Sequence, residues 1–190
     1  MYDSFKQITP ENWLQPDKAF LIAAPISIPQ WIEYVQNRLL LQSRPLVEAE
    51  VKPEDWLGLI NGPQLNDEVP EDVRALFEGA RGMLAYGYCF YPLCTLAVDQ
   101  LYRVLEAAVT HRCRTLNGPK DKTPLKQKLE WLAKQGILNA EQSKEWDAAR
   151  TLRNDTSHPS FQMLMIPNAC VLSLVQTADD VNFLFASSPP

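Results

Sequence analysis

The sequence predicts an all-α protein. Over most of the chain, apolar residues recur at intervals of three and four, the spacing that places them on one face of an α-helix. Proline, glycine and asparagine interrupt this pattern where helices are expected to stop, most clearly at Asn61-Gly62-Pro63. No stretch alternates apolar and polar residues in the manner of a β-strand. These patterns favour an antiparallel helical bundle over residues 70–186, preceded by an irregular and helical extension over 1–69 that packs on it.

The extension begins with a proline-punctuated arm of about thirty residues. Trp13, Phe20, Leu21 and Ile22 give this arm apolar side chains to bury against the rest of the protein. Pro29 then suits the first position of a helix, and the apolar spacing that follows predicts that helix over 30–42.

A second short helix is expected over 53–60, followed by a polar loop over 64–70. From residue 70 onward the pattern is almost continuously helical, and acidic residues in the first turn support a helix over 71–85. The remaining predicted helices span 93–116, from 124 to Gln135-Gly136, from an Asn139 N-cap to about Ser157, and 168–185.

Charge is distributed unevenly along a chain whose net charge is −5. Residues 1–90 carry 7 Lys/Arg against 13 Asp/Glu, whereas residues 91–160 carry 11 against 8. The acidic total does not favour a nucleic-acid partner, but the local positive balance leaves one open. The alternative interpretation of the second stretch is a solvated helical surface.

The cysteines and the apolar runs indicate a cytoplasmic protein without a membrane segment. Cys89, Cys94, Cys113 and Cys170 show no C-x-x-C spacing and are expected to be small buried thiols. No apolar run approaches the ~20 residues that span a bilayer. The N-terminus lacks the basic and apolar pattern of a signal peptide.

The most informative residues lie near the end of the chain, in Arg153-Asn154-Asp155-Thr156-Ser157-His158-Pro159. The residue before a proline is pushed out of helical geometry, so the helix should end near Ser157. His158 then leaves the regular helical array, which could bring its imidazole beside the Arg153 guanidinium. An Arg and a His held close together can cleave a phosphodiester without a metal.

Structural interpretations of the same residues remain open. Arg153 could pair with an acidic side chain inside the bundle, and residues 154–157 could be helix-ending and turn chemistry. His158 could fill space or donate to a carbonyl. The second histidine, His111, is expected at the edge of the core, where it could bond a backbone carbonyl; a catalytic role is the alternative.

Several enzyme classes find no support in the sequence. Two histidines without a paired carboxylate signature give no metal site, so neither a metal nor another cofactor is expected. A phosphate-cradling G-x-x-x-x-G-K loop is absent, and so is the G-x-S-x-G of many serine hydrolases.

The last 120 residues resemble the HEPN superfamily, helical domains of many prokaryotic toxins, defence systems and RNA-processing factors. The resemblance depends on the Arg-x4-His spacing from Arg153 to His158 and on the order of the helices before it. This part of the chain is similar to an uncharacterised bacterial branch of HEPN-like domains in which the sequence motif LRN…SHP recurs. The segments that carry the resemblance are Leu101-Tyr102-Arg103-Val104-Leu105-Glu106, the Leu-rich 125–132, Gln135-Gly136-Ile137-Leu138 and Leu152-Arg153-Asn154.

The resemblance implies a metal-independent endoribonuclease of the toxin–antitoxin or phage-defence type, in which two copies pair across one cleft. Arg153 would clamp the scissile phosphate, His158 would act as general base or acid, and Asn154 would orient the phosphate or the imidazole. Asp155 and Ser157 are candidate substrate-binding residues. The expected partners are a second copy, RNA, and a neutralising antitoxin or another protein. The alternative is a non-catalytic HEPN-like module for dimerisation or for binding a nucleotide or RNA.

Overall fold

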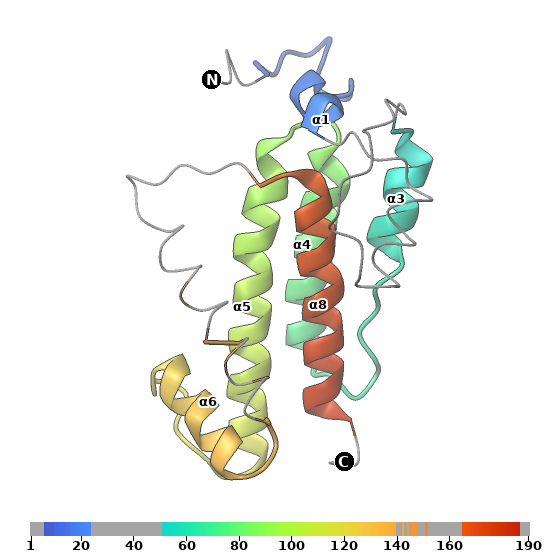
Figure 1. Ribbon diagram of the computed structural model, residues 1–190. Helices are drawn as coiled ribbons and strands as arrows, with labels where there is room; N and C mark the ends of the chain where they lie inside the picture. Colours follow the sequence, from blue (N-terminus) through green and yellow to red (C-terminus); the bar gives the residue numbers. More distant parts are fainter. Residues whose placement is uncertain are drawn as a thin grey trace, which may run out of the picture. The chain divides into compact units, whose positions relative to one another are not determined.

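The computed structural model describes residues 6–23, 51–139, 142, 144, 146, 147, 151 and 165–186. The protein is all-α, as predicted: six helices have defined bounds, and none of the described residues lies in a strand (Figure 1). Among these residues, no helix combines the length and the apolar composition needed to cross a bilayer. The helices are α1 (Lys18–Ala23), α3 (Pro53–Asn61), α4 (Glu71–Gly87), α5 (Pro92–Thr115), α6 (Leu125–Lys134) and α8 (Pro167–Phe185).

The predicted bounds agree closely with those of α3, α4, α5, α6 and α8, and the largest change is the extension of α4 by two residues to Gly87. The polar loop over 64–70 is also confirmed. The arm, in contrast, contains the short helix α1. The predicted helix over 30–42 lies outside the described residues.

Two helices end in the same left-handed cap. Asn117 after α5 has a φ of 55°, and Gly136 after α6 has a φ of 74°. At the first cap, the Gly118 amide donates to the Cys113 carbonyl at 2.8 Å; at the second, the Ile137 amide donates to the Leu132 carbonyl at 3.0 Å. These bonds form Schellman motifs, which satisfy carbonyls that a helix end otherwise leaves without partners.

The fold divides into two compact units, and α4, α5 and α8 contribute residues to both. The described residues of unit 1 are 6–23, 51–63, 80–98 and 165–175. Those of unit 2 are 64–79, 99–139, five residues between 142 and 151, and 176–186.

The core of unit 1 is built around Phe20 of α1, which is fully buried. Its ring meets three other rings edge-on, with centroids 4.9 Å from Trp56, 5.4 Å from Tyr88 and 6.2 Å from Tyr91. Edge-to-face contacts at such distances stabilise aromatic pairs beyond the effect of their burial alone. The Trp56 indole, buried in the same core, donates to the Leu84 carbonyl at 2.9 Å. The arm is thus fixed to unit 1 through one aromatic side chain.

Polar contacts hold the rest of the arm to the turn between α4 and α5. The buried Asp17 carboxylate accepts hydrogen bonds from the amides of Tyr91 and Ala19, both at 2.9 Å, and thereby caps α1. Lys6 Nζ donates to the carbonyls of Gln15 at 2.6 Å and Cys89 at 2.8 Å.

The expectation that the arm buries Trp13, Phe20, Leu21 and Ile22 was wrong for Trp13 and Ile22. Trp13 is 55% exposed and Ile22 is 79% exposed, whereas Phe20 is buried. Ile22 follows Phe20 by two residues on α1, about 200° around the helix, so it faces away from the core when Phe20 is buried.

The cysteine prediction is confirmed for Cys94, Cys113 and Cys170, which are buried, and Cys89 is half-buried. A hydrogen bond with the Cys170 thiol, together with burial, raises the pKa of Cys94 far above its usual range. Glycine is required beside this thiol, because a Cβ at Gly87 would lie 2.5 Å from the Cys94 sulfur. The Cys94–Cys170 pair is therefore a packed, unreactive part of the unit 1 core.

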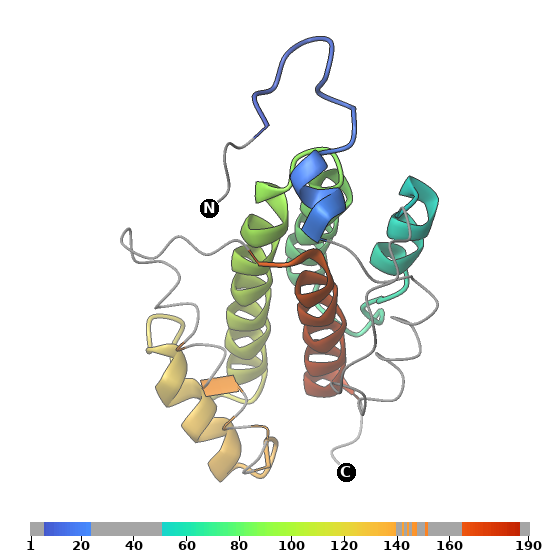
Figure 2. The same ribbon diagram turned by 45° about the horizontal axis from the view of Figure 1, so that its top comes forward.

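In unit 2, α4, α5, α6 and α8 all contribute buried side chains to the core, and α6 lies beside the C-terminal part of α5 (Figures 1 and 2). Asn182 of α8 fixes the preceding polar loop, since its side chain accepts from the Asn66 amide at 2.9 Å and donates to the Gln64 carbonyl at 2.8 Å. The buried side chains of this unit include Val69, Val73, Phe77, Leu101, Val104, Ala108, Leu129, Leu132, Val181 and Leu184.

Candidate functional site

The predicted catalytic motif lies outside the described residues. This applies to Arg153, Asn154, Asp155, Ser157 and His158, so their roles stay predictions. The described residues that most closely precede the motif along the chain are Trp146, Asp147 and Thr151, all of them helical.

The helix that leads toward the motif begins as predicted, at Asn139. The Asn139 side chain accepts from the Gln142 amide at 2.9 Å, and the Gln142 side chain accepts from the Asn139 amide at 3.0 Å. This reciprocal pair is a capping box, which fixes both the start and the direction of a helix. Trp146, one turn further on, is buried at 5% exposure and anchors the same helix.

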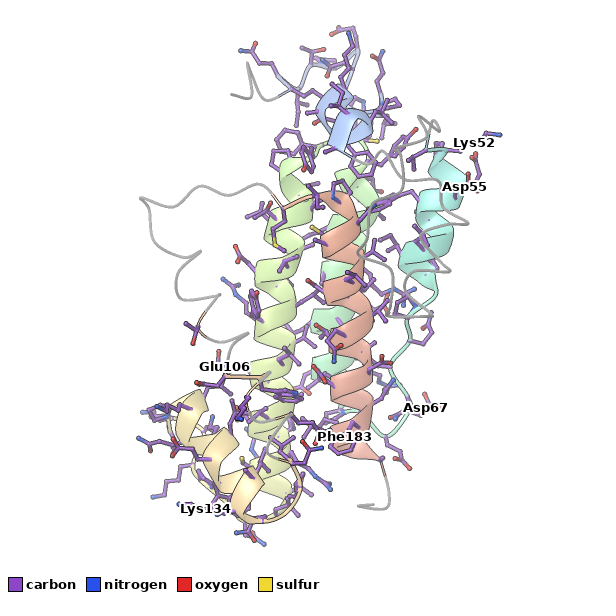
Figure 3. The ribbon with its side chains drawn as sticks, viewed as in Figure 1. Lys52, Asp55, Asp67, Glu106, Lys134 and Phe183 are labelled. Carbon is purple, nitrogen blue, oxygen red and sulfur yellow. The ribbon has the colours of Figure 1, made fainter. Side chains whose placement is uncertain are left out.

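Immediately before that helix, residues 111–134 form a segment rich in positive charge, named here the basic segment. It contains seven Lys/Arg and only two Asp/Glu, in a chain of net charge −5. The segment comprises the end of α5, a loop over 116–124 and all of α6; Lys134 marks its end in Figure 3. Its exposed cations are Arg114, Lys120, Lys122, Lys126 and Lys134.

One lysine of the basic segment has a different role. Lys128 is 2% exposed, the only buried Lys or Arg among the described residues. Its ammonium donates to the Thr110 hydroxyl at 2.8 Å and to the Asp121 carbonyl at 2.7 Å. Hydrogen bonds from a charged donor are stronger than neutral ones, so Lys128 ties the loop over 116–124 to both α5 and α6.

Two further contacts hold the same loop. Arg114 of α5 donates to the Asp121 carboxylate at 2.8 Å, and this pairing lowers the pKa of Asp121 and raises that of Arg114. The Trp131 ring of α6 lies against Gly118, where a Cβ would come within 2.7 Å of the ring. The loop therefore presents Lys120 and Lys122 on a fixed backbone.

His111, at the start of the basic segment, has a different partner from the one expected. Its Nε2 lies 2.7 Å from an Asp72 carboxylate oxygen, instead of bonding a backbone carbonyl. Asp72 is in the first turn of α4, where the helix dipole also favours a negative charge. The contact joins α4 to α5 within unit 2 and gives His111 a structural role.

Replacing Asp72 by asparagine is expected to make the fold less sensitive to acid. The hydrogen bond with His111 holds the pKa of Asp72 below its ordinary value of 3.8. A carboxyl group whose pKa is lower in the folded state than in the unfolded state stabilises the fold at pH values above its unfolded pKa. This stabilisation is lost as the pH falls from 3.8 to the pKa of the folded state. Because the side chain is 66% exposed, the contribution is below about 1 kcal/mol.

The measurement is the urea midpoint of unfolding between pH 6 and pH 2, with Glu71→Gln as the matched control. Glu71 shares the first turn of α4 but not the contact with His111, so the difference between the variants isolates that contact. The parent should lose its advantage over Asp72→Asn as the pH falls. A constant advantage down to pH 2 would contradict this assignment.

Sequence reasoning missed Lys128 and the fixed loop. A usable signal was present, because Lys128 interrupts the apolar stripe of Leu125, Leu129 and Leu132, which places a cation on the buried face of α6. The Asp72–His111 contact had no comparable signal, since its partners are 39 residues apart.

The described residues offer a cationic surface and no metal centre. No group of three or more His, Cys, Asp or Glu side chains in this part of the chain could hold a metal ion. The charge, the fixed loop and the position before the Arg153 motif together suit the backbone of an anionic polymer. No family model, curated protein or solved structure matches the chain.

Proposed function

We propose that the chain is a metal-independent endoribonuclease of the toxin or defence type, related to HEPN domains and acting in the cytoplasm as a homodimer. The observation that carries the proposal is the basic segment. It precedes, in the chain, the capped helix that leads to Arg153 and His158. RNA would be bound by the basic segment and cut at the Arg/His pair.

The charge distribution supports RNA binding because phosphate contacts dominate the affinity of proteins for nucleic acids. Five exposed cations within 21 residues, from Arg114 to Lys134, can follow a single strand of RNA. Lys120 and Lys122 are held on a loop that is already ordered, so little conformational entropy is lost when they bind.

The proposed reaction is transfer of the phosphoryl group to the neighbouring 2′-hydroxyl. His158 accepts the proton of the 2′-hydroxyl as this oxygen attacks phosphorus, and the bond to the 5′-oxygen breaks. Arg153 donates hydrogen bonds to the phosphate oxygens as negative charge develops on them. The products are a 2′,3′-cyclic phosphate and, after a proton is taken up, a free 5′-hydroxyl. DNA lacks the attacking group and would not be cut.

The test is incubation of the full chain with single-stranded RNA in the presence of EDTA, with matched DNA as the control. Cleavage of RNA alone, with cyclic phosphate at the new ends, supports the proposal. RNA that stays intact at every protein concentration overturns it.

Replacing Lys120 and Lys122 by glutamine is expected to weaken RNA binding and its dependence on salt. Each phosphate contact contributes about 0.7 to the slope of log affinity against log salt for single strands, so the slope should fall by roughly 1.4. Fluorescence anisotropy with a labelled RNA at several salt concentrations measures this slope. Lys52→Gln, an exposed lysine of unit 1 labelled in Figure 3, should leave it unchanged. Equal slopes for the parent and the double variant would exclude the basic segment as the RNA site.

A non-catalytic module that binds RNA or pairs two copies is the second candidate. The acidic net charge of −5 favours the pairing role, because two copies can pair without any attraction for RNA. This candidate predicts salt-dependent RNA binding without any cleavage, so the two assays above separate it from the nuclease.

A further inference from the structure

One tryptophan accompanies the cations of the basic segment. Trp131 is half-buried on α6 and is the only Trp between residues 111 and 134. Of the other described tryptophans, Trp13 and Trp56 belong to unit 1, and Trp146 is buried. The phosphate contacts proposed for the basic segment use its charges and leave the role of the Trp131 ring open.

The loop over 116–124 fixes one end of the Trp131 ring. A Cβ at Gly118 would lie 2.7 Å from Cζ3 and Cη2 of the ring and 3.0 Å from Cε3, so the ring passes directly against the loop backbone. Gly118 is itself held, because its amide donates to the Cys113 carbonyl at 2.8 Å. Lys128, one turn before Trp131, ties the same loop to α6. The orientation of the ring is therefore set before a ligand arrives, which reduces the entropy lost on binding.

The other end of the Trp131 ring reaches solvent. Cε3, Cζ3 and Cη2 lie on the side of the six-membered ring away from Nε1, so the contact with Gly118 leaves the indole N–H uncovered. Nε1 donates to no residue in the described part of the chain, and it is not among the buried donors without a partner. The indole N–H of Trp56, in contrast, is bonded to the Leu84 carbonyl. A tryptophan with one end packed and the other end in water is typical of binding surfaces.

Exposed lysines accompany the ring on α6 and on the loop. Lys134, labelled in Figure 3, follows Trp131 by three residues, so the two side chains share one face of α6. Lys120 and Lys122 lie on the loop that the ring contacts. Glu130, the acidic residue of α6, is one position before Trp131 and points about 100° away around the helix. An aromatic ring among cations is the arrangement with which proteins bind single-stranded nucleic acids.

We propose that the Trp131 ring stacks on an unpaired base of the bound RNA. Phosphate contacts carry no information about the bases, so the cations alone give no means of recognising them. The bases of a single strand can separate from their neighbours and lie against an aromatic ring, whereas those of a duplex are stacked inside the helix. Trp131 therefore favours RNA whose bases are unpaired.

The inference rests on the proposed RNA binding by the basic segment, but not on cleavage at Arg153 and His158. It adds to the charged contacts one apolar contact that salt does not screen. The two kinds of contact can therefore be measured separately.

The experiment is fluorescence anisotropy of the full chain with a 2′-O-methylated single strand, which cannot be cut, at several salt concentrations. Trp131→Leu should bind this strand roughly 5- to 150-fold more weakly, the loss expected for one stacked base. Its slope of log affinity against log salt should equal that of the parent, because the phosphate contacts remain. Its affinity for the same strand in a duplex, and for inorganic polyphosphate, which has charge but no bases, should not change.

Two substitutions serve as controls. Trp131→Phe keeps an aromatic ring and should retain most of the affinity, whereas Trp13→Leu removes an exposed tryptophan of unit 1 and should leave binding unchanged. Far-UV circular dichroism that matches the parent shows that each variant retains its helices. An abasic strand tests the parent without any substitution, and the parent should bind it more weakly than the strand with bases.

An unchanged affinity of Trp131→Leu for the single strand overturns the inference, as does an equal loss of affinity for polyphosphate. Equal binding of the abasic and the complete strand by the parent also overturns it. In each of these results, weaker binding by Lys120→Gln/Lys122→Gln would still support the proposed RNA site. A parent that binds no RNA removes both the inference and the proposed function.

Discussion

Replacing His158 by alanine is expected to slow RNA cleavage by about 10²- to 10⁴-fold, the usual contribution of a general acid or base. In the proposed reaction His158 removes the proton of the attacking 2′-hydroxyl, and alanine cannot do so. RNA binding should change little, because the basic segment supplies most of the phosphate contacts. Single-turnover cleavage and anisotropy with a non-cleavable RNA measure the two effects separately.

His111→Ala is the matched control, since the chain contains only two histidines. His111 is engaged with Asp72 at 2.7 Å, so its loss should reduce the free energy of unfolding and leave the rate of cleavage intact. Arg153→Lys adds a second control, because it keeps the positive charge but loses the two-pronged guanidinium. A His158→Ala protein that cuts RNA as fast as the parent would rule out the proposed mechanism.

Replacing Phe20 by alanine is expected to destabilise unit 1 by about 3–5 kcal/mol. The ring is fully buried, and three aromatic neighbours surround it with centroids between 4.9 and 6.2 Å away. Alanine would leave a cavity that Trp56 cannot fill without losing the hydrogen bond from its indole to the Leu84 carbonyl. Urea unfolding followed by tryptophan fluorescence measures the change, and the signal of Trp56 lies inside this core.

Ile22→Ala is the matched control, two residues further along the same helix. Ile22 is 79% exposed, so its truncation should change the free energy of unfolding by less than about 0.5 kcal/mol. Equal effects of the two substitutions would mean that α1 is not anchored through Phe20. The comparison also tests the assignment of α1 as a helix with one buried face.

Helices with long apolar stripes could be predicted from the sequence, because periodicity depends on residues a few positions apart. The bounds of α3, α5 and α8 followed from the spacing and from stop signals such as Asn61-Gly62-Pro63. The N-cap at Asn139 followed from the capping preference of asparagine. In each instance the structure depends on residues a few positions apart, so it can be predicted from the sequence.

The helix α1 was not predicted because its causes are not local. It has only six residues, and its N-cap Asp17 is held by the amide of Tyr91, 74 residues away. The burial of Lys128 could have been predicted from its place in the apolar stripe of α6, but its acceptors on Thr110 and Asp121 could not, because they come from other elements. The predicted catalytic residues, Arg153 and His158 among them, lie outside the described part of the chain and remain predictions.

Because of the basic segment, the net charge of the protein does not determine which ligands this part of its surface attracts. Dissolved ions screen charges beyond about 8 Å at physiological ionic strength, so a polyanion near Lys120 experiences the local field. There it meets the five exposed cations of the basic segment and its two anions, Asp121 and Glu130, and charges farther away are largely screened from it. A sequence pI of 5.1 therefore says little about what this end of α5 and α6 attracts.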